Sequence, residues 1–206
     1  MSGASEFPPG FFARDDETDD RDFYAPVRLV THIDDGAIAA VGALYDELGL
    51  RGRVLDLMSS WVSHFHAPPD ALVALGMNAY ELRRNGQAIG GVVHDLNALP
   101  RLPFPDSTFD AAVCCVSVDY LVRPVDVFRA VHAVLRPGAP FVLTFSNRCF
   151  PTKAIRAWLY TDDATHLEIV AEYFRRSGGW RDVRREIRRQ GAPGRDPLYA
   201  VWGYRA

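Results

Sequence analysis

Apolar runs and helical patterns alternate along most of the chain. Five short runs consist largely of apolar residues: "RVLDLM" (53–58), "ALVALG" (71–76), "IGGVVHDL" (89–96), "FDAAVCCVSV" (109–118) and "PFVLTFSN" (140–147). Runs of this length with little polar alternation are typical of strands buried on both faces of a parallel sheet. The closing segments "RDVRREIRRQ" (181–190) and "PLYAVWGYRA" (197–206) predict two more strands.

Between these runs the apolar positions recur every three or four residues, which predicts helices. In residues 34–50 this spacing joins Ile38, Val41, Leu44, Tyr45 and Leu48. Asp34 or Asp35 can cap the start of this helix, and Gly49 can end it. Further helices are predicted in 81–85, 124–135 and 162–177. Strands separated by helices indicate a parallel sheet covered on both faces, within a single domain at 23–206.

Residues 1–22 carry a different pattern. The stretch "RDDETDDRD" (14–22) has six acids in nine positions, so we expect a flexible acidic N-terminal tail that stays solvated. A mobile lid over a site is the alternative. Phe7, Phe11 and Phe12 favour the lid, because their rings need an apolar environment.

Composition limits the functional classes. A net charge of −3 provides no attraction to nucleic acid, and no apolar run approaches the roughly 20 residues that span a bilayer. The start of the chain shows no secretory signal pattern. Three cysteines, two of them adjacent, do not suggest a disulfide framework. We therefore expect a cytoplasmic protein, monomeric or homodimeric, that binds neither nucleic acid nor membrane.

In parallel sheets, ligands bind beyond the carboxyl ends of the strands. The first predicted strand ends in Asp56, Met58, Ser59 and Ser60, where many nucleotide-binding folds have glycines. The missing glycines argue against a dinucleotide or a phosphate-binding loop. Serine hydroxyls, in turn, add hydrogen-bond donors that glycine lacks.

The next two strand ends also carry polar groups. Asn78 stands 22 residues after Asp56, close to the spacing of a ribose-binding acid, although it can equally cap the following helix. Asp95, followed by Leu96, can accept a hydrogen bond from the exocyclic amine of a base, or it can form a turn.

Beyond the fourth and fifth strands lie the candidates for chemistry. Asp119 is the candidate general base, with a helix-capping role as its alternative, and Tyr120 can position a substrate. Ser117 and Asn147 follow the same two strands. Cys149 is disfavoured as a nucleophile, because no neighbour in sequence would stabilise its thiolate.

Together these segments resemble the class I S-adenosylmethionine-dependent methyltransferases, in particular the type 11 group. The resemblance covers roughly residues 48–138. "VHDLNALPRLPFPDSTFDAAVC" and "VFRAVHAVLRPGAPFVLT" match the family's pattern closely, whereas "VLDLMSS" and "ALGMNAYEL" match it with changes. The resemblance implies an α/β fold, a Rossmann-like three-layer sandwich whose seven-stranded, mostly parallel sheet has an antiparallel last strand.

The resemblance also implies a site for S-adenosylmethionine. Asp56 and the turn Met58, Ser59, Ser60 would lie along its methionine portion, Asn78 would face the ribose, Asp95 and Leu96 would face the adenine, and Ser117 would line the floor. Two positions depart from the family pattern: Ser-Ser-Trp replaces Gly-x-Gly, and Asn78 replaces an acid. Both departures bear on how strongly the cofactor binds.

We therefore expect methyl transfer to a small-molecule acceptor. Asp119 and Tyr120 are the catalytic candidates, and the substrate candidates are Tyr24, His32, Trp61, His64 and Asn147. The main alternative is a non-catalytic binding or scaffold protein of the same fold with a degraded cofactor turn. A metal site at His64, His66 and Cys149 is disfavoured because further ligands at suitable spacing are missing, so no metal is expected. RNA binding by the arginines of 175–189 is disfavoured because acids lie among them.

Overall fold

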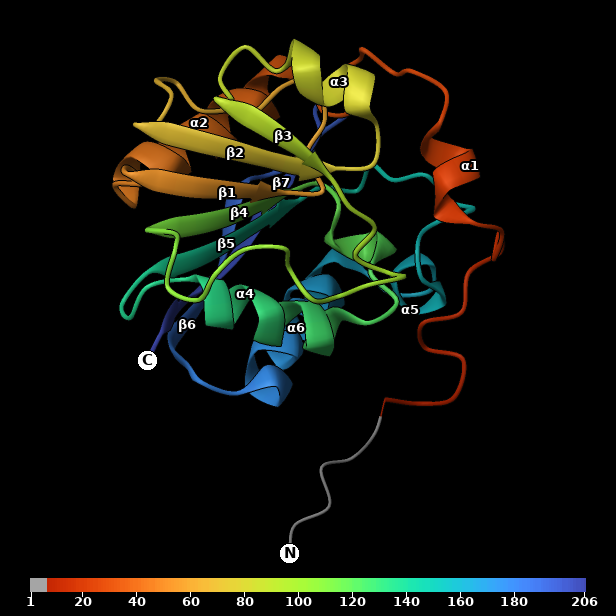
Figure 1. The fold of residues 1–206 in the computed structure, drawn as a ribbon. Helices are drawn as coiled ribbons and strands as arrows, with labels where there is room; N and C mark the ends of the chain where they lie inside the picture. Colours follow the sequence, from red (N-terminus) through yellow and green to blue (C-terminus); the bar gives the residue numbers. More distant parts are fainter. Residues whose placement is uncertain (1–6) are drawn as a thin grey trace, which may run out of the picture.

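The computed structural model describes residues 7–206, and its centre is a seven-stranded sheet (Figure 1). The strand order across the sheet is β3-β2-β1-β4-β5-β7-β6. The strands are β1 (Arg53–Leu57), β2 (Ala71–Gly76), β3 (Gly90–Val93), β4 (Ala111–Cys115), β5 (Pro140–Phe145), β6 (Trp180–Arg189) and β7 (Leu198–Arg205). All seven predicted strands are confirmed, with boundaries trimmed by a few residues.

Strands β1 to β5 run parallel, and β7 runs antiparallel to its neighbours β5 and β6. The connection between β6 and β7 covers only residues 190–197, and a link this short joins strands of opposite direction. The predicted mostly parallel sheet with an antiparallel last strand is therefore confirmed.

Helices cover both faces of this sheet and make three layers (Figure 1). Helices α2 (Asp35–Glu47) and α3 (Ala79–Arg84) lie on one side, and α4 (Pro124–Val134) and α6 (Asp163–Ser177) lie on the other. Asp34 caps α2 by accepting a hydrogen bond from the backbone N–H of Ala37. Two apolar clusters, one on each face, fill the space between sheet and helices and account for most of the core. Each fully buried apolar side chain there contributes about 1.5–3 kcal/mol.

Two connections between parallel strands contain no helix. Residues 58–70, between β1 and β2, are irregular, and so are residues 94–110 between β3 and β4. Side chains that follow α3 hold the first of these segments in place. Gln87 Nε2 donates to the Phe65 carbonyl at 2.7 Å, and Asn85 Nδ2 donates to the Ser63 hydroxyl at 2.8 Å. Pro68 and Pro69 disfavour a helix directly before β2.

The described part of the N-terminal stretch packs against the domain, which corrects the expectation of a solvated tail. Phe7, Phe11 and Phe12 contact the apolar cluster beside α4 and α6, and residues 1–6 lie outside the described part of the chain. Two short helices, α1 (Asp20–Tyr24) and α5 (Arg156–Leu159), were not predicted.

Two carboxylates of the acidic stretch pair with a lysine from elsewhere in the fold, and one of them also pairs with the arginine that begins the stretch. Lys153, whose side chain is 0% exposed, lies 3.2 Å from the Asp16 carboxylate and 3.1 Å from that of Asp20. Arg14 lies 2.9 Å from Asp20. The charge of residues 14–22 alone predicted a solvated tail. That prediction missed Lys153, which lies 133 residues after Asp20 and supplies the opposite charge.

Within residues 7–206, no helix is long and apolar enough to cross a membrane.

Candidate functional site

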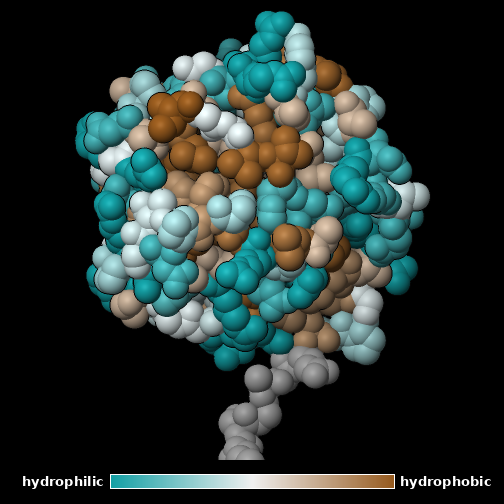
Figure 2. Space-filling model, viewed as in Figure 1, coloured by the Kyte–Doolittle hydropathy of each residue, from teal (hydrophilic) through white to brown (hydrophobic). Residues whose placement is uncertain are grey.

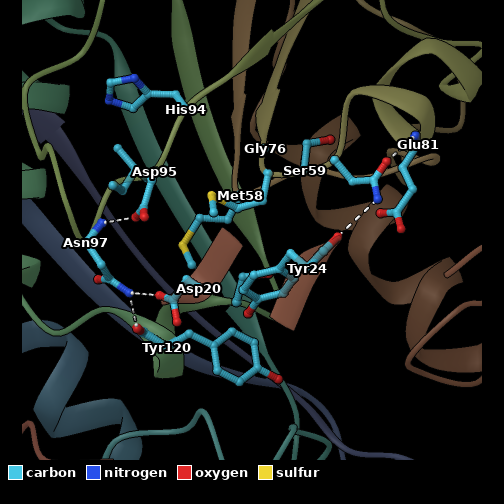
Figure 3. Close-up of a pocket in the computed structure, with 14 residues that line it drawn as sticks. Asp20, Tyr24, Met58, Ser59, Gly76, Glu81, His94, Asp95, Asn97 and Tyr120 are labelled. Atoms are coloured by element: carbon cyan, nitrogen blue, oxygen red, sulfur yellow. Dashed lines mark hydrogen bonds between the residues drawn. The ribbon is translucent and has the colours of Figure 1, made fainter. Parts of the chain in front are cut away.

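A cavity of about 550 Å³ lies at the carboxyl ends of β1 to β4 (Figure 3). Every one of these strands contributes lining residues from the segment that follows it, and α1 contributes from across the opening. The lining residues are Asp20, Tyr24, Met58, Ser59, Gly76, Met77, Asn78, Glu81, His94, Asp95, Leu96, Asn97, Ser117 and Tyr120. We call this the first cavity. It contains six of the eight residues predicted to bind a cofactor.

The turn after β1 folds tightly onto the end of β2. Met58 adopts the left-handed conformation, with φ of 53°, and the backbone N–H of Ser59 donates to the Leu75 carbonyl at 2.8 Å. A Cβ at Gly76 would come within 2.1 Å of the Ser59 carbonyl oxygen. The close packing of the turn on β2 therefore requires a glycine at position 76. Serines fit at positions 59 and 60 because neither has a positive φ.

Asp56 is buried beneath this turn. Its carboxylate accepts hydrogen bonds from the hydroxyls of Ser59, at 2.6 Å, and Ser63, at 2.5 Å. Burial raises the pKa of Asp56 to about 6, although the two hydroxyls oppose the shift. Asp56 does not line the first cavity but a second one beside it, so it supports the turn from below.

Asn78 both caps α3 and lines the first cavity. Its Oδ1 accepts from the backbone N–H groups of Tyr80 and Glu81, and its Nδ2 donates to the carbonyls of Tyr24 and Ala25. The capping alternative is thus observed, and the amide also fixes the end of α1 beside the cavity. Its donors are already occupied by backbone oxygens.

Glu81 brings a carboxylate to the same region. It follows Asn78 by three residues, so both lie on the first turn of α3. Its two oxygens accept from the backbone N–H of Arg28 at 2.7 Å and from the Ser60 hydroxyl at 2.6 Å. Ser60, which lines the second cavity, is thereby joined to the first one.

The segment after β3 forms the opposite wall. Asp95 accepts through Oδ1 from the backbone N–H groups of Asn97 and Ala98, so the turn-forming alternative is also observed. Among residues 7–206, nothing donates a hydrogen bond to its other oxygen, Oδ2, so that atom is free to accept from a ligand. Leu96 is buried at the cavity wall and offers an apolar surface.

Helix α1 closes the front of the first cavity. Figure 3 shows Asp20 and Tyr24 among the side chains of the strand ends. Asn97 Nδ2 donates to Asp20 and to the Tyr120 carbonyl, at 2.9 Å each, and so links α1 to the segments after β3 and β4. Burial and the nearby carboxylate of Asp119 raise the pKa of Tyr24, so its hydroxyl stays protonated.

A second cavity, of about 710 Å³, adjoins the first. Four residues line both of them: Met58, Ser59, Ser117 and Tyr120. Its other walls come from 30–32, from 60–65 and from Phe150, and they include the predicted substrate residues His32 and His64. Asn147 lines a third, more open cavity, which shares His32, Tyr120 and Phe150 with the second.

Two predicted site residues lie away from these cavities. Asp119 is only 3% exposed, lines none of the three cavities and has an Oδ2 atom without a hydrogen-bond partner among the described residues. Burial raises its pKa to about 8. The expectation that it projects into the cleft is wrong, because the 3-10 turn Val118–Tyr120 directs Tyr120 there instead. Trp61 also lies outside, with its indole N–H donating to the Val30 carbonyl.

Several cavity residues were missed by sequence reasoning: Asp20, Gly76, Met77, Glu81, His94 and Asn97. Four of them stand next to a predicted strand end, and Glu81 follows Asn78 by three residues, so proximity to these ends was a usable signal. Nothing near Asp20 in the sequence indicated its position.

The charge of the first cavity suits a cationic ligand. Three carboxylates, from Asp20, Glu81 and Asp95, line it, and none of the described lysines or arginines does. Because Arg14 and Lys153 pair with Asp20 from outside the cavity, Glu81 and Asp95 carry its negative charge. Such a lining disfavours the phosphates of a dinucleotide and favours a ligand that carries positive charge. Leu96 and Met77 add apolar surface for a planar ring, and the free Asp95 Oδ2 can accept from its amine. The residues therefore fit an adenosyl group joined to a sulfonium.

Comparisons with known proteins agree with this fit. Residues 57–143 match the model of a family described as methyltransferase domain. No match was found among curated proteins. Among solved structures, an S-adenosylmethionine-dependent methyltransferase from Mesorhizobium loti is similar at 18% identity and a TM-score of 0.52, over 76% of this chain and 92% of that one.

Two further solved structures have related folds. A methyltransferase from Thermotoga maritima, described as a possible histamine N-methyltransferase, has 11% identity and a TM-score of 0.62, over 82% of this chain and 90% of that one. The [4+2]-cyclase SpnF has 13% identity and a TM-score of 0.58, over 87% and 89%. The predicted resemblance is confirmed: residues 57–143 match the model of a methyltransferase domain, and the chain has the fold of S-adenosylmethionine-dependent methyltransferases.

Proposed function

We propose that this protein transfers the methyl group of S-adenosylmethionine to a small-molecule acceptor, with the cofactor in the first cavity and the acceptor in the second. The observation that carries the proposal is the shared wall. Met58, Ser59, Ser117 and Tyr120 border both cavities, so a group held in one faces a group held in the other.

In the first cavity, each polar group has a proposed partner. Asp95 Oδ2 accepts from the adenine amine, and Leu96 packs against its ring. Glu81, which lines the cavity together with Asn78, accepts from the ribose hydroxyls. Met58 and Ser59 lie along the methionine portion, and Ser117 forms the floor. Glu81 thus supplies the negative charge that Asn78 lacks.

S-adenosylmethionine brings a methyl group that its sulfonium already activates. The protein's task is therefore to hold the acceptor in line with that methyl group and to exclude water. Alignment of two bound partners supplies about 7–11 kcal/mol when the geometry is good. Tyr120 is suited to positioning because its hydroxyl accepts from the backbone N–H of Phe150 at 2.8 Å, which fixes its ring.

The enclosure of the second cavity supports a small acceptor. Its lining includes residues 30–32, which precede α2, residues from the segment 60–65, and Phe150. A macromolecular acceptor would have to insert one side chain or base through this opening.

Calorimetric titration with S-adenosylmethionine and S-adenosylhomocysteine tests the cofactor half of the proposal. We expect saturable binding of both, and a higher melting temperature with either ligand by mass action. Formation of S-adenosylhomocysteine with members of an acceptor panel tests the transfer half. Absence of binding by either ligand at millimolar concentration would refute the proposal.

The second candidate is a non-catalytic binding protein of the same fold. Its support is that two polar groups expected to bind the cofactor are already hydrogen-bonded within the protein. These are the carboxylate of Asp56 and the amide of Asn78. The similarity to a [4+2]-cyclase is also a reminder that a fold does not fix a reaction. A folded protein that binds neither S-adenosylmethionine nor S-adenosylhomocysteine would favour this candidate.

A further inference from the structure

Two of the six imidazoles differ from the rest. Four have a ring nitrogen in a hydrogen bond: His66 with Asp46, His94 with the Leu99 carbonyl, His132 with the Gly179 carbonyl and His166 with the Trp158 carbonyl. His32 and His64 have no hydrogen-bond partner within residues 7–206.

These two imidazoles line the same cavity. Both His32 and His64 border the second cavity, although they come from segments that are 32 residues apart. His64 lies on the irregular segment after β1 and is half-buried, whereas His32 also borders the third cavity and is more exposed. A ring nitrogen with no protein partner, on a residue that lines a cavity, is available to a ligand.

The walls around them are aromatic. Tyr45, Phe65, Tyr120 and Phe150 all line the second cavity. The ring centroids of His32 and Phe150 lie 5.1 Å apart, and those of Tyr120 and Phe150 lie 5.9 Å apart. Walls of this kind suit a planar ring, because aromatic side chains pack edge-to-face or offset against one another.

We propose that His64 is a catalytic residue that removes the proton from an aromatic acceptor carrying a ring hydroxyl or ring N–H. This inference rests on the proposed function and names its acceptor class. The acceptor's O–H or N–H proton passes to the imidazole, and the electron pair left on that oxygen or nitrogen forms the new bond to the methyl carbon. The carbon–sulfur bond breaks with its electron pair staying on sulfur, and the imidazolium later releases the proton to water.

The surroundings of His64 favour the neutral form of its ring, which is the form that can accept a proton. Burial, followed by the nearby His32, lowers the pKa of His64, so its ring is neutral and able to accept a proton at pH 7. The other titratable groups that line the cavity are Tyr45 of α2, Asp56 of β1, Cys115 of β4 and Tyr120. Burial raises the pKa values of all four, so the tyrosines and the cysteine stay protonated at neutral pH.

The pKa of His32 depends on burial and on three charged residues, Arg28, Arg148 and Glu81. Burial lowers the pKa of His32, the two arginines lower it further, and Glu81 opposes them. His32 is therefore also neutral near pH 7, but its exposure leaves it in contact with water. The more enclosed His64 is the better candidate for proton removal close to the methyl group.

The test compares His64→Gln with the wild type, using phenol, thioanisole and N,N-dimethylaniline as probes. These three share a ring, but only phenol has a proton to lose. We expect S-adenosylhomocysteine formation with phenols and not with the other two, and a fall of about 100-fold or more in kcat for His64→Gln. In the wild type, kcat should rise with pH as the His64 imidazole loses its proton. This rise should be absent from the pH profile of His64→Gln.

The matched control is His66→Gln, since His66 lies on the same segment but is exposed and paired with Asp46. It should keep the wild-type rate and pH profile. A second readout needs no turnover: NMR of the histidine rings should give a pKa for His64 below the ordinary value of a free imidazole. Calorimetry should give the same S-adenosylhomocysteine affinity for His64→Gln as for the wild type.

Each contrary outcome is informative. A wild-type rate in His64→Gln, loss of the rise with pH in His32→Gln instead, or methylation confined to the probes without a proton would overturn the role of His64 while leaving the proposed function intact. No turnover of any phenol or of any aromatic compound with a ring N–H would do the same for the acceptor class. Loss of cofactor affinity in His64→Gln would place this side chain in the cofactor site and also overturn the inference. Failure of the wild type to bind the cofactor would instead overturn the proposed function.

Discussion

Replacing Gly76 with alanine tests how the turn after β1 is accommodated. An added Cβ would lie 2.1 Å from the Ser59 carbonyl oxygen, and real Cβ atoms essentially never approach closer than 3.0 Å. Either the turn or the end of β2 must therefore move by about 0.9 Å. Both are backbone segments within a hydrogen-bonded sheet, so neither can swing aside as a side chain would.

Overpacking of this kind costs about 1–3 kcal/mol. In a domain of this size, 1 kcal/mol shifts Tm by about 2–4 °C, so we expect Tm to fall by about 2–12 °C. Met58 and Ser59, which line the first cavity, move with the turn. We therefore expect the affinity for S-adenosylhomocysteine to fall about tenfold or more, which corresponds to about 1.4 kcal/mol.

Differential scanning calorimetry and titration calorimetry measure the two effects. Gly90→Ala is the matched control, because Gly90 lies in the neighbouring strand β3 and a Cβ there meets nothing within 4 Å. It should leave both Tm and affinity close to the wild-type values. If Gly76→Ala behaved like Gly90→Ala in both measurements, the close packing of the turn on β2 would be refuted.

Three further predictions address single side chains. Lys153→Met should leave the buried Asp20 with only part of its compensation and lower the free energy of unfolding by about 2–4 kcal/mol in urea titrations; a loss below 1 kcal/mol would mean that Arg14 alone suffices. Asp95→Ala should weaken S-adenosylmethionine binding in calorimetry, and unchanged affinity would dismiss Asp95 as the partner of the adenine. The folded-state pKa of Asp56 is raised from 3.8 to about 6, so the stability that it contributes is present below pH 4 and is lost as the pH rises through 6. Asp56→Asn lacks this dependence and should gain about 2–3 kcal/mol relative to the wild type between pH 4 and pH 7; a constant difference would contradict the raised pKa.

The repeating pattern of the chain was enough to predict the sheet. Strand β4 is apolar throughout because both of its faces are covered, and α2 shows its buried stripe and its cap directly in the order of residues. Such features depend on neighbours a few positions apart. The antiparallel last strand followed from the family resemblance rather than from any local signal.

The positions of site residues could be predicted only as far as a strand end fixes them. Asp95, Leu96 and Ser117 lie at the first cavity because the carboxyl ends of parallel strands share one edge of the sheet. Asp119 stands only two residues beyond Ser117, yet a single 3-10 turn directs it into the interior. The direction of a side chain after a strand depends on backbone angles that a spacing rule does not contain.

The sequence by itself determined the fold class, the edge of the sheet that carries the site and the family that it resembles, because these depend on periodicity and on motifs of consecutive residues. Only the tertiary structure decided that Gly76 makes room for the turn at Ser59, that Lys153 neutralises Asp20 and brings α1 over the first cavity, and that His32 and His64 line one space. Each of these is a contact between residues well separated along the chain. Burial and pairing across such separations set the energy of each contact, and neither can be read from local composition.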